Sequence, residues 1–136
     1  MTTQKYVNDI AYQIVGCAIE VHKQLGPGLL ESVYEECLLD ELINIGLFPK
    51  RQIAVPIFYK GKELATPLKL DLIVNDLVIV EIKSVDVLLP VFKAQLLTYL
   101  KLSGKPKGLL INFNSEYITQ QLIPLVTDEF SKLSKT

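Results

Sequence analysis

Residues 68–83 constrain the fold of this chain more than any other stretch. The segment LKLDLIV is followed by Asn75 and Asp76, which favour a turn, and then by LVIVEIK, in which most residues are apolar. A nearly continuous apolar run of this length is typical of a central strand covered on both faces of a sheet. The sequence therefore predicts an antiparallel pair of strands, residues 68–74 and 77–83, within the sheet.

The flanking sequence alternates between helix and strand patterns. Apolar residues recur at three- and four-residue steps in three stretches, which predicts helices over residues 7–25, 30–45 and 90–103. Further strands are predicted over residues 53–59, 63–66, 107–113 and 117–126. We expect Asn8 to cap the first helix and Pro56 to place its strand at a sheet edge. This order predicts one α/β domain, residues 1–136, with a mixed central sheet flanked by helices.

Composition and charge argue against nucleic-acid binding by overall positive charge, and against a membrane-spanning or secreted protein. The formal net charge is −1, and Arg51 is the one arginine among 14 basic residues, so any contact with nucleic acid must come from a local patch. Cys17 and Cys37 lie in apolar helical patterns and are expected to be reduced and buried. No apolar run approaches the roughly 18 residues that span a bilayer, and the N-terminus does not resemble a secretory signal. We expect a cytoplasmic protein without a membrane partner.

Three charged residues fall on the two apolar strands. Glu81 and Lys83 are two residues apart and so point to the same face of their strand. Burying these charges is costly unless they are paired or bind something. A three-residue loop over 75–77 would set Asp71 opposite Glu81 and match the apolar faces, whereas a two-residue turn would set Asp71 opposite Val80.

Two adjacent carboxylates and an ammonium suit phosphodiester chemistry. Asp71 and Glu81 are the hard oxygen ligands that Mg²⁺, or Mn²⁺, takes together with water and phosphate oxygens. Such a metal acidifies bound water, and Lys83 beside it can position that water or offset negative charge. The alternative is a structural ion pair between Lys83 and one of the carboxylates.

Longer motifs extend this pattern over most of the chain. They are LGPGLLESVYEECL, LKLDLIV, VIVEIKSV, AQLLTYLKLSG and GLLINF. Together they resemble the GxxExxY protein family, which belongs to the PD-(D/E)XK nuclease superfamily. The resemblance implies a restriction-endonuclease-like αβββαβ core that hydrolyses phosphodiester bonds.

The resemblance also implies roles for five residues. Asp71 and Glu81 would bind magnesium and Lys83 would be the catalytic lysine. Glu31 would correspond to the acidic residue of the first core helix, as a further catalytic residue and metal ligand. Gln95 would correspond to a glutamine that faces the site from the helix after the Glu-x-Lys strand.

Each of these helix residues also has a structural interpretation. Glu31 lies where a carboxylate favours the start of a helix, and Gln95 could simply bond to the sheet edge. Tyr34 and Tyr99, on the same helical faces, are more typical of packing. His22, the one histidine, is expected to be solvated on a helix surface.

Lysines supply the remaining candidates for contact with nucleic acid. The resemblance favours Lys69, two positions before Asp71, and further lysines gather around the third helix and the next strand at Lys93, Lys101, Lys105 and Lys107. Lys60 and Lys62 lie on a predicted hairpin. These lysines could equally solvate a surface, and no series of aromatic residues interleaves them as a single-strand platform requires.

Two functions are compatible with these features. The first is a magnesium-dependent nuclease that acts on DNA, or less favourably RNA. The second is a non-catalytic module that keeps the fold and binds nucleic acid or protein. Low net basicity favours the second, as does Phe92, where relatives often have histidine. Because a chain this short leaves little room for a separate target-recognition domain, homodimerisation or a partner protein could extend its contact with the target.

Overall fold

A five-stranded sheet in the order β1-β4-β5-β6-β7 forms the centre of the computed structural model, which describes residues 1–136. Its strands are β1 (Pro49–Val55), β4 (Leu68–Val74), β5 (Val78–Lys83), β6 (Lys107–Asn112) and β7 (Leu122–Val126). The pairing of β5 with β6 is parallel and the other pairings are antiparallel, so the sheet is mixed. This arrangement confirms the predicted α/β class with a restriction-endonuclease-like core.

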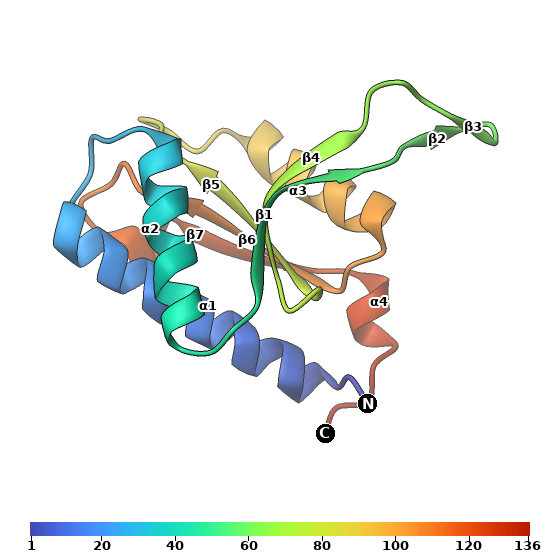
Figure 1. Ribbon diagram of the computed structural model, residues 1–136, viewed down its shortest axis with the longest axis horizontal. Helices are drawn as coiled ribbons and strands as arrows, with labels where there is room; N and C mark the ends of the chain where they lie inside the picture. Colours follow the sequence, from blue (N-terminus) through green and yellow to red (C-terminus); the bar gives the residue numbers. More distant parts are fainter.

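Helices cover both faces of the sheet, as Figure 1 shows. Helices α1 (Gln4–Leu25) and α2 (Glu31–Asn44) pack on one face, and α3 (Pro90–Ser103) packs on the other. Alternate residues of β5 contribute to the two hydrophobic cores on either side of the sheet. Val78, Val80 and Ile82 pack in the core beneath α1 and α2, and Ile79 packs in the core beneath α3. The nearly unbroken apolar run of β5 follows from burial on both sides.

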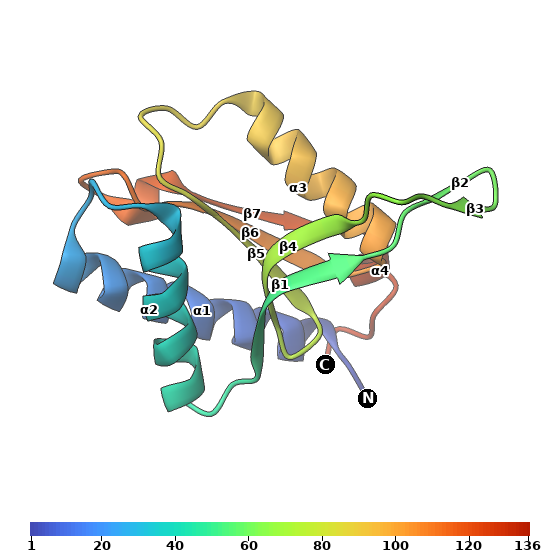
Figure 2. The same ribbon diagram turned by 45° about the horizontal axis from the view of Figure 1, so that its top comes forward.

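Three short elements complete the chain. A hairpin of β2 (Phe58–Tyr59) and β3 (Lys62–Glu63) forms a separate two-stranded ribbon, and it reaches away from the sheet in Figures 1 and 2. A 3₁₀ helix, η1 (Ile118–Gln121), precedes β7, and α4 (Asp128–Ser131) follows it. No helix has both the length and the apolar composition to cross a bilayer.

Two predicted strands have other bounds than expected, since β1 begins at Pro49 and β7 at Leu122. The pattern at 53–59 is divided, because Pro56 has no N–H for a ladder and β1 ends at Val55. The expected edge position of β1 is confirmed by the strand order. The pattern at 117–126 begins as the 3₁₀ helix, from which Ile118 inserts into the α1–α2 core.

The cap and histidine predictions are wrong, and the expected burial of the cysteines is confirmed for Cys17 but not for Cys37. Thr3, not Asn8, caps α1, since its hydroxyl accepts a bond of 3.0 Å from the N–H of Tyr6. His22 is half-buried, with Nε2 2.6 Å from the carbonyl of Ser115. Cys17 is buried and Cys37 half-buried, and both are free thiols.

The β4–β5 register is the feature that positions the candidate site. Its pairs are Leu72 with Val80, Ile73 with Ile79, and Val74 with Val78, leaving a three-residue loop over 75–77. Extending this register places Asp71 opposite Glu81, as predicted from the matching of apolar faces.

Candidate active site

Strands β4 and β5 stop forming regular ladder pairs beyond Leu72 and Val80, where the two acids lie. There the N–H of Ile82 donates to Oδ2 of Asp71 over 2.8 Å. The N–H of Asp71 points to Oε1 of Glu81 at 3.4 Å, a long bond. Each carboxyl group therefore bonds to the backbone of the opposite strand, which draws the two acids together.

Burial makes it costly for both carboxyl groups to be ionised. Glu81 is only 5% exposed, and its burial, together with the negative charge of Asp71, raises its pKa to about 8. Burial also raises the pKa of Asp71, although the bond from the N–H of Ile82 opposes that rise. At neutral pH the pair holds a proton that a cation between the two acids would displace.

Lys83 completes the group on β5. It is half-buried and lies two residues after Glu81, on the same face of the strand. Its charge partly offsets the raised pKa of each acid. Its Nζ lies 4.8 Å from the centroid of the Phe92 ring on α3, a cation–π distance. The ammonium therefore packs on an aromatic ring of α3 while its charge acts on the acid pair without a direct ion pair.

A hollow of about 130 Å³ opens beside Asp71, between α2, β1 and β5. Its lining residues are Glu31, Ser32, Glu35, Gln52, Asp71 and Ile82. Glu31, the first residue of α2, is exposed at its rim. No three His, Cys, Asp or Glu side chains are grouped closely enough to hold a metal ion. The structure therefore brings Glu31 to the same hollow as Asp71 without completing a three-acid cluster.

Tyr34 fixes the loop that leads into α2. Its hydroxyl donates to the carbonyl of Gly26 over 2.6 Å and accepts from the N–H of Leu29 over 3.2 Å. Its ring stacks on Phe113 with centroids 4.6 Å apart. The hydroxyl of Ser84, just after β5, donates to the carbonyl of Leu29 over 2.6 Å. Tyr34 therefore packs, as interpreted from the sequence, and also anchors the loop before Glu31.

Glu35, Arg51 and Gln52 form a network beside Asp71 that the sequence analysis did not identify. Glu35 is 5% exposed, and it accepts bonds from Arg51 (2.8 and 3.1 Å) and from the amide of Gln52 (2.7 Å). Its charge adds to the rise in the pKa of Asp71. The spacing of Glu35 four residues after Glu31 was a usable signal, because both lie on one helical face.

Gln52 adopts a backbone conformation that the local sequence does not predict. Its φ is +51°, in the left-handed region that is uncommon for residues other than glycine. The regular β1–β4 pairs skip it and leave it opposite Asp71. This local distortion turns the Gln52 side chain toward Glu35 on α2.

Gln95 is not brought to the acid pair. Its amide donates to the hydroxyl of Tyr99 over 2.8 Å, one turn along α3. It lines a separate shallow hollow on α3 with Val91, Phe92, Ala94 and Thr98. The predicted role of Gln95 therefore rests on the sequence alone.

The five predicted nucleic-acid lysines do not form one patch. Lys69 on β4 and the α3 residues Lys93 and Lys101 are exposed. Lys105 instead pairs with Asp76 at 3.0 Å. Lys107 donates to Asn8 over 2.8 Å, and burial lowers its pKa.

Parallel pairing explains the separation. Lys107 pairs with Val78, at the start of β5, whereas Lys83, at the end of β5, pairs with Asn112. The two lysines therefore lie at opposite ends of the sheet, roughly 16 Å apart along the strands. Lys105 and Lys107, which follow α3, therefore lie at the end of the sheet remote from the acid pair.

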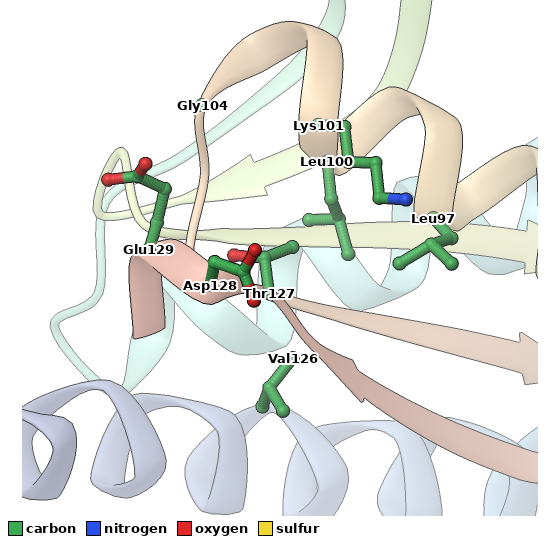
Figure 3. A pocket seen from close by; sticks show the side chains of 8 residues that line it. All are labelled: Leu97, Leu100, Lys101, Gly104, Val126, Thr127, Asp128 and Glu129. Atoms are coloured by element: carbon green, nitrogen blue, oxygen red, sulfur yellow. The ribbon is translucent and has the colours of Figure 1, made fainter. Parts of the chain in front are cut away.

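A larger hollow of about 330 Å³ lies at that opposite end, and Figure 3 shows its lining. It is formed by Leu97, Leu100, Lys101, Gly104, Val126, Thr127, Asp128 and Glu129. Because Val126 pairs with Lys107, this hollow is remote from Glu81 and Lys83. It contains none of the predicted catalytic residues.

One of three comparisons with known proteins, the match to a family model, agrees with the expected superfamily. A family model described as the PD-(D/E)XK nuclease superfamily matches residues 8–124. A solved structure described as "Crystal structure of SSO0001" resembles the chain with a TM-score of 0.44 at 18% identity, covering 88% of this chain. This chain spans 65% of the length of that one. No curated protein matches the sequence. The family match includes both strands of the acid pair and nearly all of the sheet, and the chain belongs to the PD-(D/E)XK nuclease superfamily.

Proposed function

We propose that this protein is a magnesium-dependent nuclease that hydrolyses phosphodiester bonds of DNA, with RNA the less favoured substrate. The observation that carries the proposal is the meeting of Asp71 and Glu81 where β4 and β5 separate. A buried acid and a half-buried acid that compete for ionisation need either a proton or a cation between them. Because the chain belongs to a nuclease superfamily, we favour a metal cation over a proton at this position in the functioning protein.

The residues present fit a magnesium or manganese ion. Mg²⁺ in proteins commonly takes one or two carboxylates, keeps several waters and adds substrate phosphate oxygens. Asp71 and Glu81 would supply the two carboxylates, and Glu31 at the rim of the hollow would contribute through water. A bound divalent cation would acidify a water molecule and stabilise charge on the phosphate.

Lys83 is proposed as the catalytic lysine. Its ammonium packs against Phe92 and its charge influences both acids, so it could orient a water or offset negative charge on the phosphate. Glu35 and Gln52 would act as positioning residues, because they hold α2 against β1 opposite Asp71. For Gln95, the support is sequence resemblance, since its amide bonds to Tyr99.

Cleavage assays test the proposal. The protein is incubated with supercoiled plasmid, single-stranded DNA and RNA in magnesium, manganese or EDTA. We expect metal-dependent cleavage, with Asp71→Asn, Glu81→Gln and Lys83→Ala each losing about 10²-fold or more in rate. Asp76→Asn, on the exposed loop of the same hairpin, is the matched control and should cleave normally.

The second candidate is a non-catalytic binding module, favoured by the absence of a three-acid cluster and by Phe92 against Lys83. Thermal melts separate the two functions. The nuclease proposal predicts that magnesium or manganese raises the melting midpoint and that Asp71→Asn abolishes the rise. No rise in wild type, together with no cleavage of any substrate, would leave only the binding module.

A further inference from the structure

The hairpin of β2 and β3 projects from the body of the molecule. We call residues 56–67 the arm; all are exposed except Ile57, which is half-buried. The arm lies outside the five-stranded sheet and extends past the end of α3 in Figures 1 and 2. A lone two-stranded ribbon gains little stability from its own contacts. Its exposed position outside the main sheet leaves its side chains free to contact a molecule outside the domain.

The arm is nevertheless a defined structure. Lys60 and Gly61 at the tip have φ values of +50° and +79°, as type I′ hairpin turns require. Tyr59 pairs with Lys62 across the turn, and the N–H of Leu64 donates to the carbonyl of Ile57 over 2.8 Å. The side chains at the tip are therefore held in fixed relation to one another.

Aromatic and basic side chains lie at this tip together with one acid, Glu63, which pairs with Phe58 on the face of the ribbon opposite Tyr59. Phe58 and Tyr59 are 61% and 62% exposed, although large aromatic side chains usually bury much of their surface. The Nζ of Lys60 lies 5.5 Å from the centroid of the Tyr59 ring, and Lys62 pairs with Tyr59. The lysines lack a long interleaved aromatic series, as the sequence indicated, but Tyr59 lies beside Lys60 and Lys62.

We propose that the arm binds a single-stranded stretch of nucleic acid. Exposed aromatic rings offer faces on which unpaired bases stack, and neighbouring lysines contact the phosphates. This inference rests on the proposed nuclease function for its substrate class. The segment through residues 64–67 and the start of β4 connects the two features: Asp71 follows Lys62 by nine positions, a span of at most about 32 Å. One nucleic-acid strand held by the arm would extend toward the acid pair.

Two observations favour this occupant over its competitors. Bases within a duplex are already stacked on one another, so a duplex leaves the rings of Phe58 and Tyr59 without faces to stack on. The arm carries Lys60, Lys62 and Glu63, so two positive charges against one negative give it a formal net charge of +1. That charge suits phosphate, whereas two arms of like net charge repel each other.

Fluorescence anisotropy in EDTA measures binding without cleavage. The probes are fluorescein-labelled oligodeoxythymidylate of about 20 nucleotides, its RNA counterpart and a duplex of equal length. We expect Phe58→Ala/Tyr59→Ala to weaken single-strand affinity by about 10-fold or more. Lys60→Ala/Lys62→Ala should reduce the slope of log affinity against log salt by about 1.4. Phe48→Ala and Lys132→Ala alter similarly exposed residues elsewhere and should leave affinity unchanged.

The results separate the arm from the nuclease. Asp71→Asn should bind the single strand like wild type without cleaving it, while the arm variants should keep the wild-type melting midpoint and lose affinity. Unchanged affinity in the arm variants, or no binding by wild type, would overturn the inference even if cleavage occurs. Light scattering provides a further check, since a dimer lost in the arm variants with unchanged oligonucleotide affinity would assign the arm to self-association instead.

Discussion

Asp71 and Glu81 each bond to the backbone of the other's strand, Asp71 through Ile82 N–H at 2.8 Å and Glu81 through Asp71 N–H at 3.4 Å. The contact replaces ladder pairing at the end of β4 and β5, so two acids occupy positions that apolar residues fill elsewhere in this part of the sheet. Two neighbouring carboxyl groups at this point cost folding free energy, because burial and mutual repulsion disfavour their ionised forms. The effects of the acid pair, and of the residues that pack around it, on stability can be measured.

The first concerns pH. The pKa of Glu81 is raised from 4.5 to about 8, so the folded state binds the proton more tightly than the unfolded chain. The resulting stabilisation is complete below about pH 4.5 and is lost as pH rises through about 8. Urea unfolding should therefore show Glu81→Gln close to wild type near pH 5 and more stable by about 1–3 kcal/mol near pH 9. Glu116→Gln, an exposed control, should show no such trend. A stability difference independent of pH would contradict the assignment.

The second concerns the ion pair behind the hollow. Arg51→Met removes the charged partner of Glu35, whose side chain is 7% exposed, while the Arg51 side chain is 40% exposed. We expect a loss of about 1–3 kcal/mol in the free energy of unfolding, because a buried carboxylate is left uncompensated. Adding Glu35→Gln should recover part of this loss, and Lys50→Met is the exposed control. Additive effects in the double variant would show that the two side chains do not interact.

The third concerns the loop before α2. Tyr34→Phe keeps the stacking on Phe113 and removes the bonds to Gly26 and Leu29. It should cost about 1–2 kcal/mol in chemical unfolding. Hydrogen exchange should show faster opening of residues 26–30, with the sheet unaffected. Slower or unchanged exchange in that loop would mean that the hydroxyl does not anchor it.

The fourth concerns the approach of α3 to the sheet. A Cβ added at Gly108 would lie 3.0 Å from Leu100 and 3.1 Å from Leu96. Gly108→Ala should therefore destabilise the fold by about 1–3 kcal/mol. Gly16, inside α1, has no atom within 4 Å of an added Cβ, so Gly16→Ala should stabilise by about 0.5–1 kcal/mol. Equal effects of the two substitutions would contradict the packing described.

Much of the fold follows from local patterns in the sequence. The register of β4 and β5 could be predicted because one register alone matches the apolar faces and sets Asp71 opposite Glu81. The bounds of α3 agree with the prediction, since Pro90 suits a first helical turn and Gly104 a helix end. These features depend on neighbours within a few residues.

Other features depend on contacts between distant segments. The ion pair of Glu35 with Arg51 joins α2 to β1, and the left-handed Gln52 carries no turn motif. Lys107 appeared beside other lysines in sequence, but parallel pairing carries it to the far end of the sheet. The placement of Gln95 against Tyr99 is a choice of side-chain rotamer that helical spacing leaves open.

The most direct test of the central claim is a manganese soak of crystals of the wild-type protein at about pH 8.5, where the acid pair loses its proton. Anomalous scattering should place one Mn²⁺ between the carboxylates of Asp71 and Glu81, at about 2.1–2.2 Å from their oxygens. Crystals of Asp71→Asn should lack that peak. Manganese bound only elsewhere, or absent at saturating concentration, would contradict the metal-dependent nuclease.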